Sequence, residues 1–90
     1  MLVTELNSNE VIHVRTEQEA IAICQLMHDA GLKWCNNKSY LDINEWNNKY
    51  GEICYNPSKG GYSRFQWYTS KKSFTIYPAS LFLEPQYEIF

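Results

Sequence analysis

Two side chains that could bind a metal ion, Cys24 and His28, stand four residues apart in a segment with helical periodicity. On a helix this spacing places both on one flank, and thiolate and imidazole are ligands that zinc favours. A structural zinc site takes four ligands, and Cys35, Cys54 and His13 would have to converge from separate segments without a recognisable spacing. We therefore expect no metal and no other cofactor, and we interpret Cys24 as a core residue beside a partly exposed histidine.

A cysteine nucleophile or a catalytic carboxylate is the other chemistry that the chain could offer. A reactive cysteine needs a base beside it in a cleft, whereas Cys24 belongs to a stripe expected to be buried, where thiols are inert. Cys35 and Cys54 have no catalytic partner close in the sequence, which also lacks the glycine patterns of phosphate-binding loops and nucleophile elbows. The carboxylates considered fit no spaced motif: Asp42, Glu45 and Glu52. The sequence therefore predicts a protein that is not an enzyme.

Composition restricts the kinds of partner. The chain has 90 residues, of which 20% are charged and 16% aromatic, with a net charge of −2. Sequence-independent binding to nucleic acid needs a basic footprint, so this balance argues against it. The N-terminus is too polar for a signal peptide, and no apolar run approaches the roughly 18–20 residues of a membrane-spanning helix. Three cysteines without a C-x-x-C pair indicate free thiols in a reducing compartment, so we expect a cytoplasmic protein without membrane contact.

The segment from Thr16 to Ala30 has the strongest helix pattern in the chain. Thr16 and Glu19 have the spacing of a capping box, in which each side chain accepts a hydrogen bond from an amide of the first turn. Gly31 suits the left-handed residue that follows many helices. Apolar residues recur at intervals of three and four and form the stripe that would cover a sheet: Ala20, Ile23, Cys24, Met27 and Ala30.

The stretch 62–77 alternates apolar and polar residues on both sides of a lysine pair, which is typical of a β-hairpin. With the turn at the lysines, Trp67 would face Ile76 across the two strands. The apolar face of this hairpin is expected to form the floor of the core beneath the helix: Phe65, Trp67, Phe74 and Ile76.

Shorter elements complete the predicted fold. Strands are expected at 11–15, 32–35 and 52–55, a turn at 56–61 and a helical turn at 79–83. Residues 36–50 form a long irregular segment in which asparagines favour turns. We expect a single domain over 1–90, with a loose N-terminal arm at 1–10 and an acidic, aromatic tail at 84–90. The predicted class is α+β: one main helix packed on a mainly antiparallel sheet of about four to five strands, in the order β-α-β-β-β-β.

The second face of the predicted hairpin carries tyrosines and an arginine, where an ordinary solvent-facing strand carries Lys, Glu and Thr. Tyrosine and arginine dominate the energetics of many interfaces, and they also suit stacking on a base with an ion pair to phosphate. The alternative is that this face only favours strand formation. The strand at 11–15 would add an arginine if it joined the same sheet. The candidate binding residues are Arg15, Tyr62, Arg64, Gln66, Tyr68 and Tyr77.

Several motifs follow one another in a recognisable order. A T-x-x-E-A helix start follows the strand at 11–15, G-x-K-W follows the helix at 31–34, Trp46 and Tyr50 mark the loop, and EICYN precedes the final FTIYPASLF. Over residues 11–83 this order resembles that of small accessory proteins encoded by phages. The resemblance rests on structural positions and implies no catalytic residues. It implies an early, host-directed protein of a kind that includes counter-defence factors, acting in the host cytoplasm.

Three functions stay open at this point. The first is a non-enzymatic binding protein that inhibits a host protein or defence complex by stoichiometric binding. The second is a sponge that sequesters a nucleotide or cyclic nucleotide between tyrosines and arginine. The third is a structural subunit whose sheet face or edge strand builds a homodimer or a larger homo-oligomer.

Overall fold

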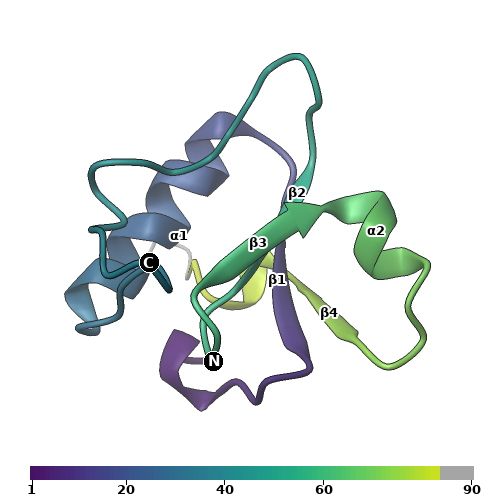
Figure 1. Ribbon diagram of the computed structural model, residues 1–90, viewed down its shortest axis with the longest axis horizontal. Helices are drawn as coiled ribbons and strands as arrows, with labels where there is room; N and C mark the ends of the chain where they lie inside the picture. Colours follow the sequence, from purple (N-terminus) through teal and green to yellow (C-terminus); the bar gives the residue numbers. More distant parts are fainter. Residues whose placement is uncertain (84–90) are drawn as a thin grey trace, which may run out of the picture.

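The protein consists of a four-stranded sheet with a helix on each of its faces (Figure 1). The computed structural model describes residues 1–83. In chain order the elements are η1 (Val3–Glu5), β1 (Glu10–Val14), α1 (Glu17–Asp29), β2 (Ile53–Asn56), β3 (Gly61–Arg64), α2 (Phe65–Thr69), β4 (Thr75–Pro78) and η2 (Ala79–Leu81). The order across the sheet is β3-β2-β1-β4, in which only β1 and β4 run parallel. The predicted α+β class, with one main helix on a mostly antiparallel sheet, is confirmed.

Helix α1 begins at the predicted cap. The Thr16 hydroxyl accepts a hydrogen bond from the Glu19 amide at 3.1 Å. The Glu19 carboxylate reaches one residue further back than in a capping box, and it accepts a hydrogen bond from the Arg15 amide at 2.8 Å. Gly31 follows the helix with φ of 83°, the left-handed conformation expected there. Within the predicted stripe, only Ala30 is exposed; it is the C-cap residue, just after the last residue of the helix.

The main core lies between α1 and one face of the sheet, here called the inner face. Ile12 and Val14 of β1 and Ile53 and Tyr55 of β2 point to this face, and each is at most 3% exposed. Ile23 of α1 is fully buried in the same cluster. Because burying one large apolar side chain contributes roughly 1.5–3 kcal/mol, this layer is the main source of stability.

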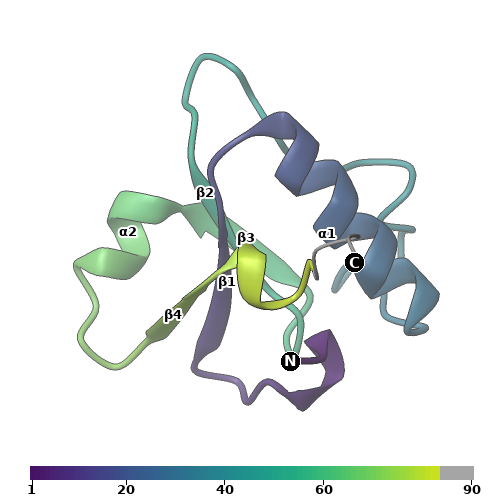
Figure 2. The ribbon, with the colours of Figure 1, turned by 180° about the vertical axis from the view of Figure 1, so that it is seen from behind.

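The predicted hairpin at 62–77 is wrong. Its first half contributes only β3, which pairs with β2, and its second half forms β4 at the other edge of the sheet. There β4 runs parallel to β1, with Val11 beside Ile76. Between the two strands, residues 65–69 form the short helix α2, which lies on the other side of the sheet from α1 (Figure 2).

Helix α2 replaces the predicted strand because the outer face of the sheet needs a cover. Phe65 and Tyr68 stand three residues apart and pack in a second apolar cluster with Val11 and Cys54 of that face. An interval of three is a helical spacing, whereas the alternation of apolar and polar residues in the same run is a strand pattern. The short run is therefore compatible with a helix and with a strand. Trp67 is 46% exposed and does not form the floor of the core. The other residues predicted for the floor are partly buried on the outer face: Phe65, Phe74 and Ile76.

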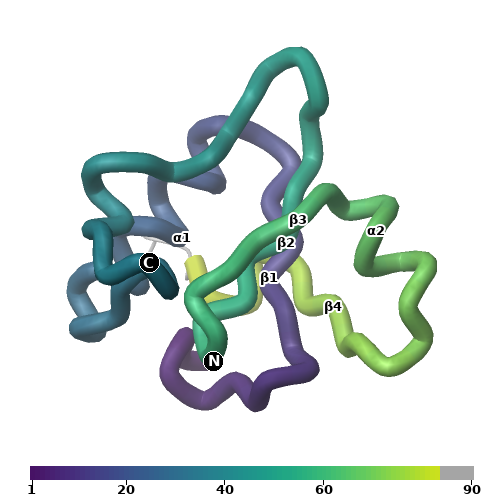
Figure 3. Tube along the Cα trace, viewed as in Figure 1, coloured from purple at the N-terminus to yellow at the C-terminus, as the bar shows by residue number. Residues whose placement is uncertain are grey.

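The segment 32–35 forms no strand. The Trp34 amide donates to the Lys38 carbonyl at 3.0 Å, and the Cys35 amide donates to the Gly60 carbonyl at 3.0 Å. These bonds turn the chain away from the sheet and tie it to the turn between β2 and β3. Residues 36–50 then run as an irregular loop to the start of β2, the long teal arch of Figure 3.

The N-terminal arm at 1–10 was expected to be loose. In the structure η1 docks on the body, with Val3 and Leu6 buried in the main core. The predicted tail at 84–90 lies outside the described residues. Near it, the helical turn predicted at 79–83 is present as η2, and Phe82 packs in the core as expected. No helix within residues 1–83 is long and apolar enough to cross a membrane.

Candidate functional site

The six predicted binding residues do not share one face. Tyr62 and Arg64 lie on β3, and their pairing with Tyr55 and Ile53 places their side chains on the inner face. Tyr77 lies on β4 at the opposite edge, roughly 14 Å away across three strand spacings. Its hydroxyl donates to the Glu10 carboxylate at 2.9 Å, and this hydrogen bond raises the pKa of Tyr77.

The other three predicted residues have separate surroundings. Tyr68 is 5% exposed on the outer face, where burial raises its pKa. Arg15 is exposed and pairs with Glu19 at the start of α1. Gln66 is exposed on α2. The prediction of a shared face is therefore wrong because it depended on the hairpin, and only Tyr62 and Arg64 are brought together.

The backbone of β3 is open along its outer edge. The Phe65 amide donates to the Glu52 carbonyl at 3.2 Å, which makes this a hydrogen-bonded pair of the β2–β3 ladder. Bonded and non-bonded pairs alternate along an antiparallel ladder, so Ser63 bonds inward to Cys54. The N–H and C=O groups of Tyr62 and the N–H of Arg64 point away from β2, at the edge that no strand within residues 1–83 covers. Arg64 is also the N-cap of α2, so its C=O accepts the first hydrogen bond of that helix.

Two buried aromatic side chains hold the loop 36–50 beside this edge. The Trp34 indole N–H donates to the Ile43 carbonyl at 2.8 Å, and the Tyr55 hydroxyl donates to the Asn44 carbonyl. Both side chains belong to the main core, where a hydrogen bond is stronger than in water. Asn44 also accepts a hydrogen bond from the Trp46 amide at 2.9 Å, which forms a local turn. The core therefore sets the position of the loop.

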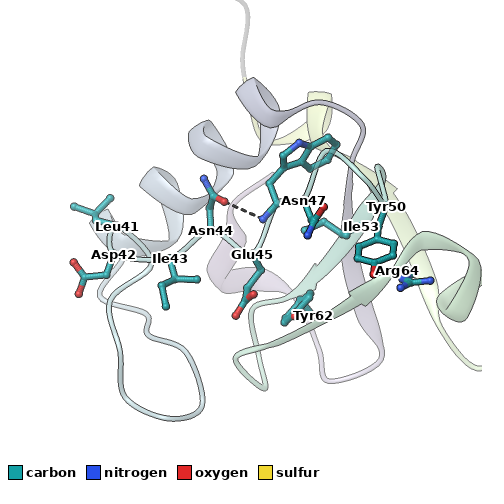
Figure 4. A pocket seen from close by; sticks show the side chains of 11 residues that line it. Leu41, Asp42, Ile43, Asn44, Glu45, Asn47, Tyr50, Ile53, Tyr62 and Arg64 are labelled. Carbon is teal, nitrogen blue, oxygen red and sulfur yellow. Dashed lines mark hydrogen bonds between the residues drawn. The ribbon is translucent and has the colours of Figure 1, made fainter.

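A cavity of about 510 Å³ opens between the loop and β3 (Figure 4). This volume is within the roughly 300–1,000 Å³ of small-molecule sites, although the cavity is partly open to solvent. Its walls combine side-chain amides, aromatic rings and charged groups of both signs. These groups belong to Asn44, Glu45, Asn47, Tyr50, Tyr62 and Arg64.

The positive group of this cavity is Arg64. Its guanidinium lies over the Tyr50 ring, 4.0 Å from the ring centroid, and Figure 4 shows the two side chains side by side. Stacking occupies one face of the guanidinium and leaves its N–H edge free. The ion pairs found within residues 1–83 join His13 to Glu52 and Arg15 to Glu19, so none of them uses Arg64.

The negative group is Glu45, on the loop side. Its side chain extends toward Tyr62 in Figure 4. Burial and the charge of the Glu45 carboxylate raise the pKa of Tyr62. Glu45 has φ of 61°, a left-handed conformation that is uncommon outside glycine, asparagine and aspartate. The turn therefore places a carboxylate beside Tyr62, which is two residues before Arg64 on β3.

A second hollow of about 310 Å³ continues along β3 beyond Glu45 and Tyr62, toward Cys35, Lys38 and Gly60. Glu45 and Tyr62 line both hollows, so the two form one furrow beside the open edge. We call it the β3 groove, and its defining residues are Asn44, Glu45, Tyr50, Gly60, Tyr62 and Arg64.

The two buried thiols offer little nucleophilic chemistry. Burial raises the pKa of Cys24 to about 11 and that of Cys54 to about 12, so both are protonated near neutral pH. As predicted, Cys24 is a core residue and His28 is exposed. Across β1 and β2, Cys54 is opposite His13, whose ring stacks on Phe65 with centroids 3.9 Å apart. Within residues 1–83, no three His, Cys, Asp or Glu side chains are placed to hold a metal ion.

Residue-by-residue inspection of the sequence missed the loop side of the groove. Tyr50, Glu45 and Asn44 reach β3 only because the loop folds back, and their spacing follows no motif. The available signal is the density of asparagines in 36–50, which indicates a structured succession of turns rather than a slack connection.

A scan of protein-family models and searches of curated proteins and of solved structures return no significant match to this chain. The function is therefore inferred from the geometry of the β3 groove.

Proposed function

We propose that this protein is a non-enzymatic binding protein that captures an extended segment of a partner protein along the edge of β3. The observation that carries the proposal is that the outward N–H and C=O of Tyr62 and the outward N–H of Arg64 lie beside the β3 groove. In recognition by strand addition, backbone hydrogen bonds supply affinity, and pockets for alternate side chains supply specificity. Both requirements are met along the same short strand.

The resemblance to small phage-encoded proteins suggests that the partner is a host protein. A viral accessory protein that added a strand to itself from a host protein would occlude that segment stoichiometrically and inhibit the host protein or defence complex. The exposed aromatic residues around the groove, Tyr50 and Tyr62, are of the type that anchors such contacts.

A second candidate is a sponge for a nucleotide or cyclic nucleotide. It is favoured by one observation, the stack of Arg64 on Tyr50 at the mouth of a 510 Å³ cavity with asparagine amides on its wall. A base could stack beside Tyr50, and the Arg64 edge could pair with phosphate. Thermal unfolding against a nucleotide panel tests this, since a ligand at 100 times its Kd stabilises by about 2.7 kcal/mol.

The test of strand addition uses a displayed library of random linear peptides, selected against the wild-type chain. Arg64 has φ of −66°, which a proline adopts without strain, and its N–H points outward, so Arg64→Pro should fold. Arg64→Gln is the matched control, because it also loses the guanidinium but keeps the N–H. We expect selected peptides to bind Arg64→Pro roughly tenfold more weakly than Arg64→Gln.

Three outcomes would count against the proposal. Equal affinity of both variants for the selected peptides would exclude the β3 edge. Failure to select any peptide, together with a nucleotide-dependent thermal shift, would favour the sponge. A dimer in light scattering that dissociates in Arg64→Pro but not in Arg64→Gln would mean that the edge pairs with a second copy of the chain.

A further inference from the structure

The β3 groove presents two opposite charges to any strand that is added at its edge. The Arg64 guanidinium is stacked on Tyr50 and free of ion pairs within residues 1–83. The Glu45 side chain extends toward Tyr62, and the two residues line the same two hollows (Figure 4). Tyr62 and Arg64 are alternate residues of one strand, so the two charges mark neighbouring positions on one face.

An added strand presents its side chains to that face at the same interval. Alternate residues of a strand are about 6.6–6.8 Å apart and point to the same side. A residue next to Arg64 and a residue next to Tyr62 would therefore be separated by one residue that points away. The two charges of the groove therefore predict which charged residues the partner sequence carries, and how far apart they stand.

We propose that the β3 groove selects segments in which a carboxylate side chain and a basic side chain stand two residues apart, with the carboxylate on Arg64 and the basic group on Glu45. A guanidinium held flat by stacking offers parallel N–H donors to both oxygens of a carboxylate. The Glu45 carboxylate, fixed in its turn, accepts from an ammonium or guanidinium. A segment with the charges exchanged would meet like charges at both positions. This inference depends on the proposed function.

Two other surfaces of the molecule give weaker support for a binding site than the β3 groove does. The aromatic surface formed by Trp67, Phe74 and Lys71 on the outer face is exposed, but nothing beside it indicates what would cover it. The mainly apolar hollow beside Leu2, Leu26 and Phe82 has one carboxylate on its wall, Asp29, and no strand edge among its lining residues that would specify an occupant. Of these three surfaces within residues 1–83, the β3 groove is the one that combines free backbone groups with a pattern of charge.

The experiment uses one peptide selected against the wild-type chain and three versions of it: carboxylate neutralised to amide, basic residue changed to Gln, and charges exchanged. We expect each neutral version to lose about tenfold in affinity for the wild type, since hydrogen bonds to charged groups contribute more than neutral ones. The same loss should appear when Arg64→Gln meets the original peptide. Arg15→Gln, which removes an arginine already paired with Glu19, should bind like the wild type.

The decisive arm is the exchange of charge on both sides. The double variant Arg64→Glu, Glu45→Lys should bind the charge-exchanged peptide at least tenfold better than the original one. Near-ultraviolet circular dichroism shows whether the double variant folds. If it does not, the single variants Arg64→Gln and Glu45→Gln are tested against the neutral peptides instead. The affinity lost by Arg64→Gln and the affinity lost by neutralising the peptide carboxylate should then not add, and the same should hold for Glu45→Gln and the basic residue of the peptide. Selected peptides that bind the β3 edge without this charge pair would overturn the inference and leave the proposed function intact. The absence of any selectable peptide would contradict the proposed function itself.

Discussion

The guanidinium of Arg64 lies 4.0 Å from the centroid of the Tyr50 ring, and this contact joins the last residue of β3 to the end of the loop 36–50. Such a stack contributes roughly 0.5–1 kcal/mol where solvent reaches it. Its larger effect is on geometry, because it holds the guanidinium against the ring and leaves N–H donors available. Tyr50 of the loop thereby positions the Arg64 side chain to bind a ligand.

The loop depends on a hydroxyl buried beneath it. Tyr55→Phe removes the donor to the Asn44 carbonyl, and we expect the free energy of unfolding to fall by about 1–3 kcal/mol. Tyr40→Phe is the matched control: within residues 1–83 its buried hydroxyl has no partner, so its removal should leave stability unchanged or raise it. Urea denaturation of both variants measures the difference. A larger loss for Tyr40→Phe would contradict this account of the loop.

Gly60 should be the least replaceable glycine. It has φ of 71°, and a Cβ on it would lie 2.6 Å from the backbone nitrogen of Cys35. Gly60→Ala therefore combines a left-handed strain of roughly 1–2 kcal/mol with a backbone clash. Gly31→Ala should cost only the strain, since its Cβ would meet no atom within 4 Å, and Gly61→Ala should be nearly neutral. Thermal unfolding should rank them in this order, and a Gly60→Ala no worse than Gly31→Ala would refute the close approach.

Alkaline pH should destabilise the fold through its two buried thiols. The pKa of Cys24 is raised from 9.0 to about 11 and that of Cys54 from 9.0 to about 12, both by burial. Because both pKa values are higher in the folded state, the stability these thiols provide is complete below pH 9 and is lost as pH rises toward 11–12. Each group lowers the free energy of unfolding by about 1.4 kcal/mol per pH unit in its window.

The measurement is urea denaturation at several pH values between 8 and 11. Cys54→Ala should start from a lower stability, because it leaves a small cavity, but its stability should fall less steeply above pH 9. Equal slopes for the wild type and for Cys54→Ala would show that this thiol ionises as readily in the folded state as in the unfolded chain.

Thiol labelling should separate the three cysteines. Cys35 is exposed, whereas Cys24 and Cys54 are buried, so a disulfide reagent should modify one thiol per folded chain quickly. The other two should react only through opening of the structure or in denaturant. In Cys35→Ala the fast phase should vanish. Three fast thiols in the native wild type would contradict the buried positions of Cys24 and Cys54.

The sequence predicted the local features best. The cap at Thr16, the buried stripe of α1 and Gly31 follow from interactions within a few residues, and the structure confirms them. The hairpin prediction was wrong because the run from Phe65 to Thr69 is compatible with both a strand and a helical periodicity. The run forms a helix because Phe65 and Tyr68 then cover apolar residues on the outer face of the sheet. The parallel pairing of β4 with β1 joins segments far apart in the chain and leaves no local signal.

The candidate site was half visible in the sequence. Tyr62 and Arg64 were found from the composition of one strand face, and they do lie together. Their companions Glu45 and Tyr50 belong to a loop whose path is set by Trp34 and Tyr55 from inside the core. Such a path depends on tertiary hydrogen bonds, which neither periodicity nor motif spacing encodes.

Amide hydrogen exchange at β3 tests the central claim most directly. In the free protein, the Tyr62 and Arg64 amides should exchange quickly, while the inward Ser63 amide is protected by Cys54. Addition of a saturating peptide selected against the wild type should slow exchange at both Tyr62 and Arg64 and leave Ser63 unchanged. A peptide that binds while the Tyr62 and Arg64 amides still exchange at their free rates would contradict strand addition at this edge.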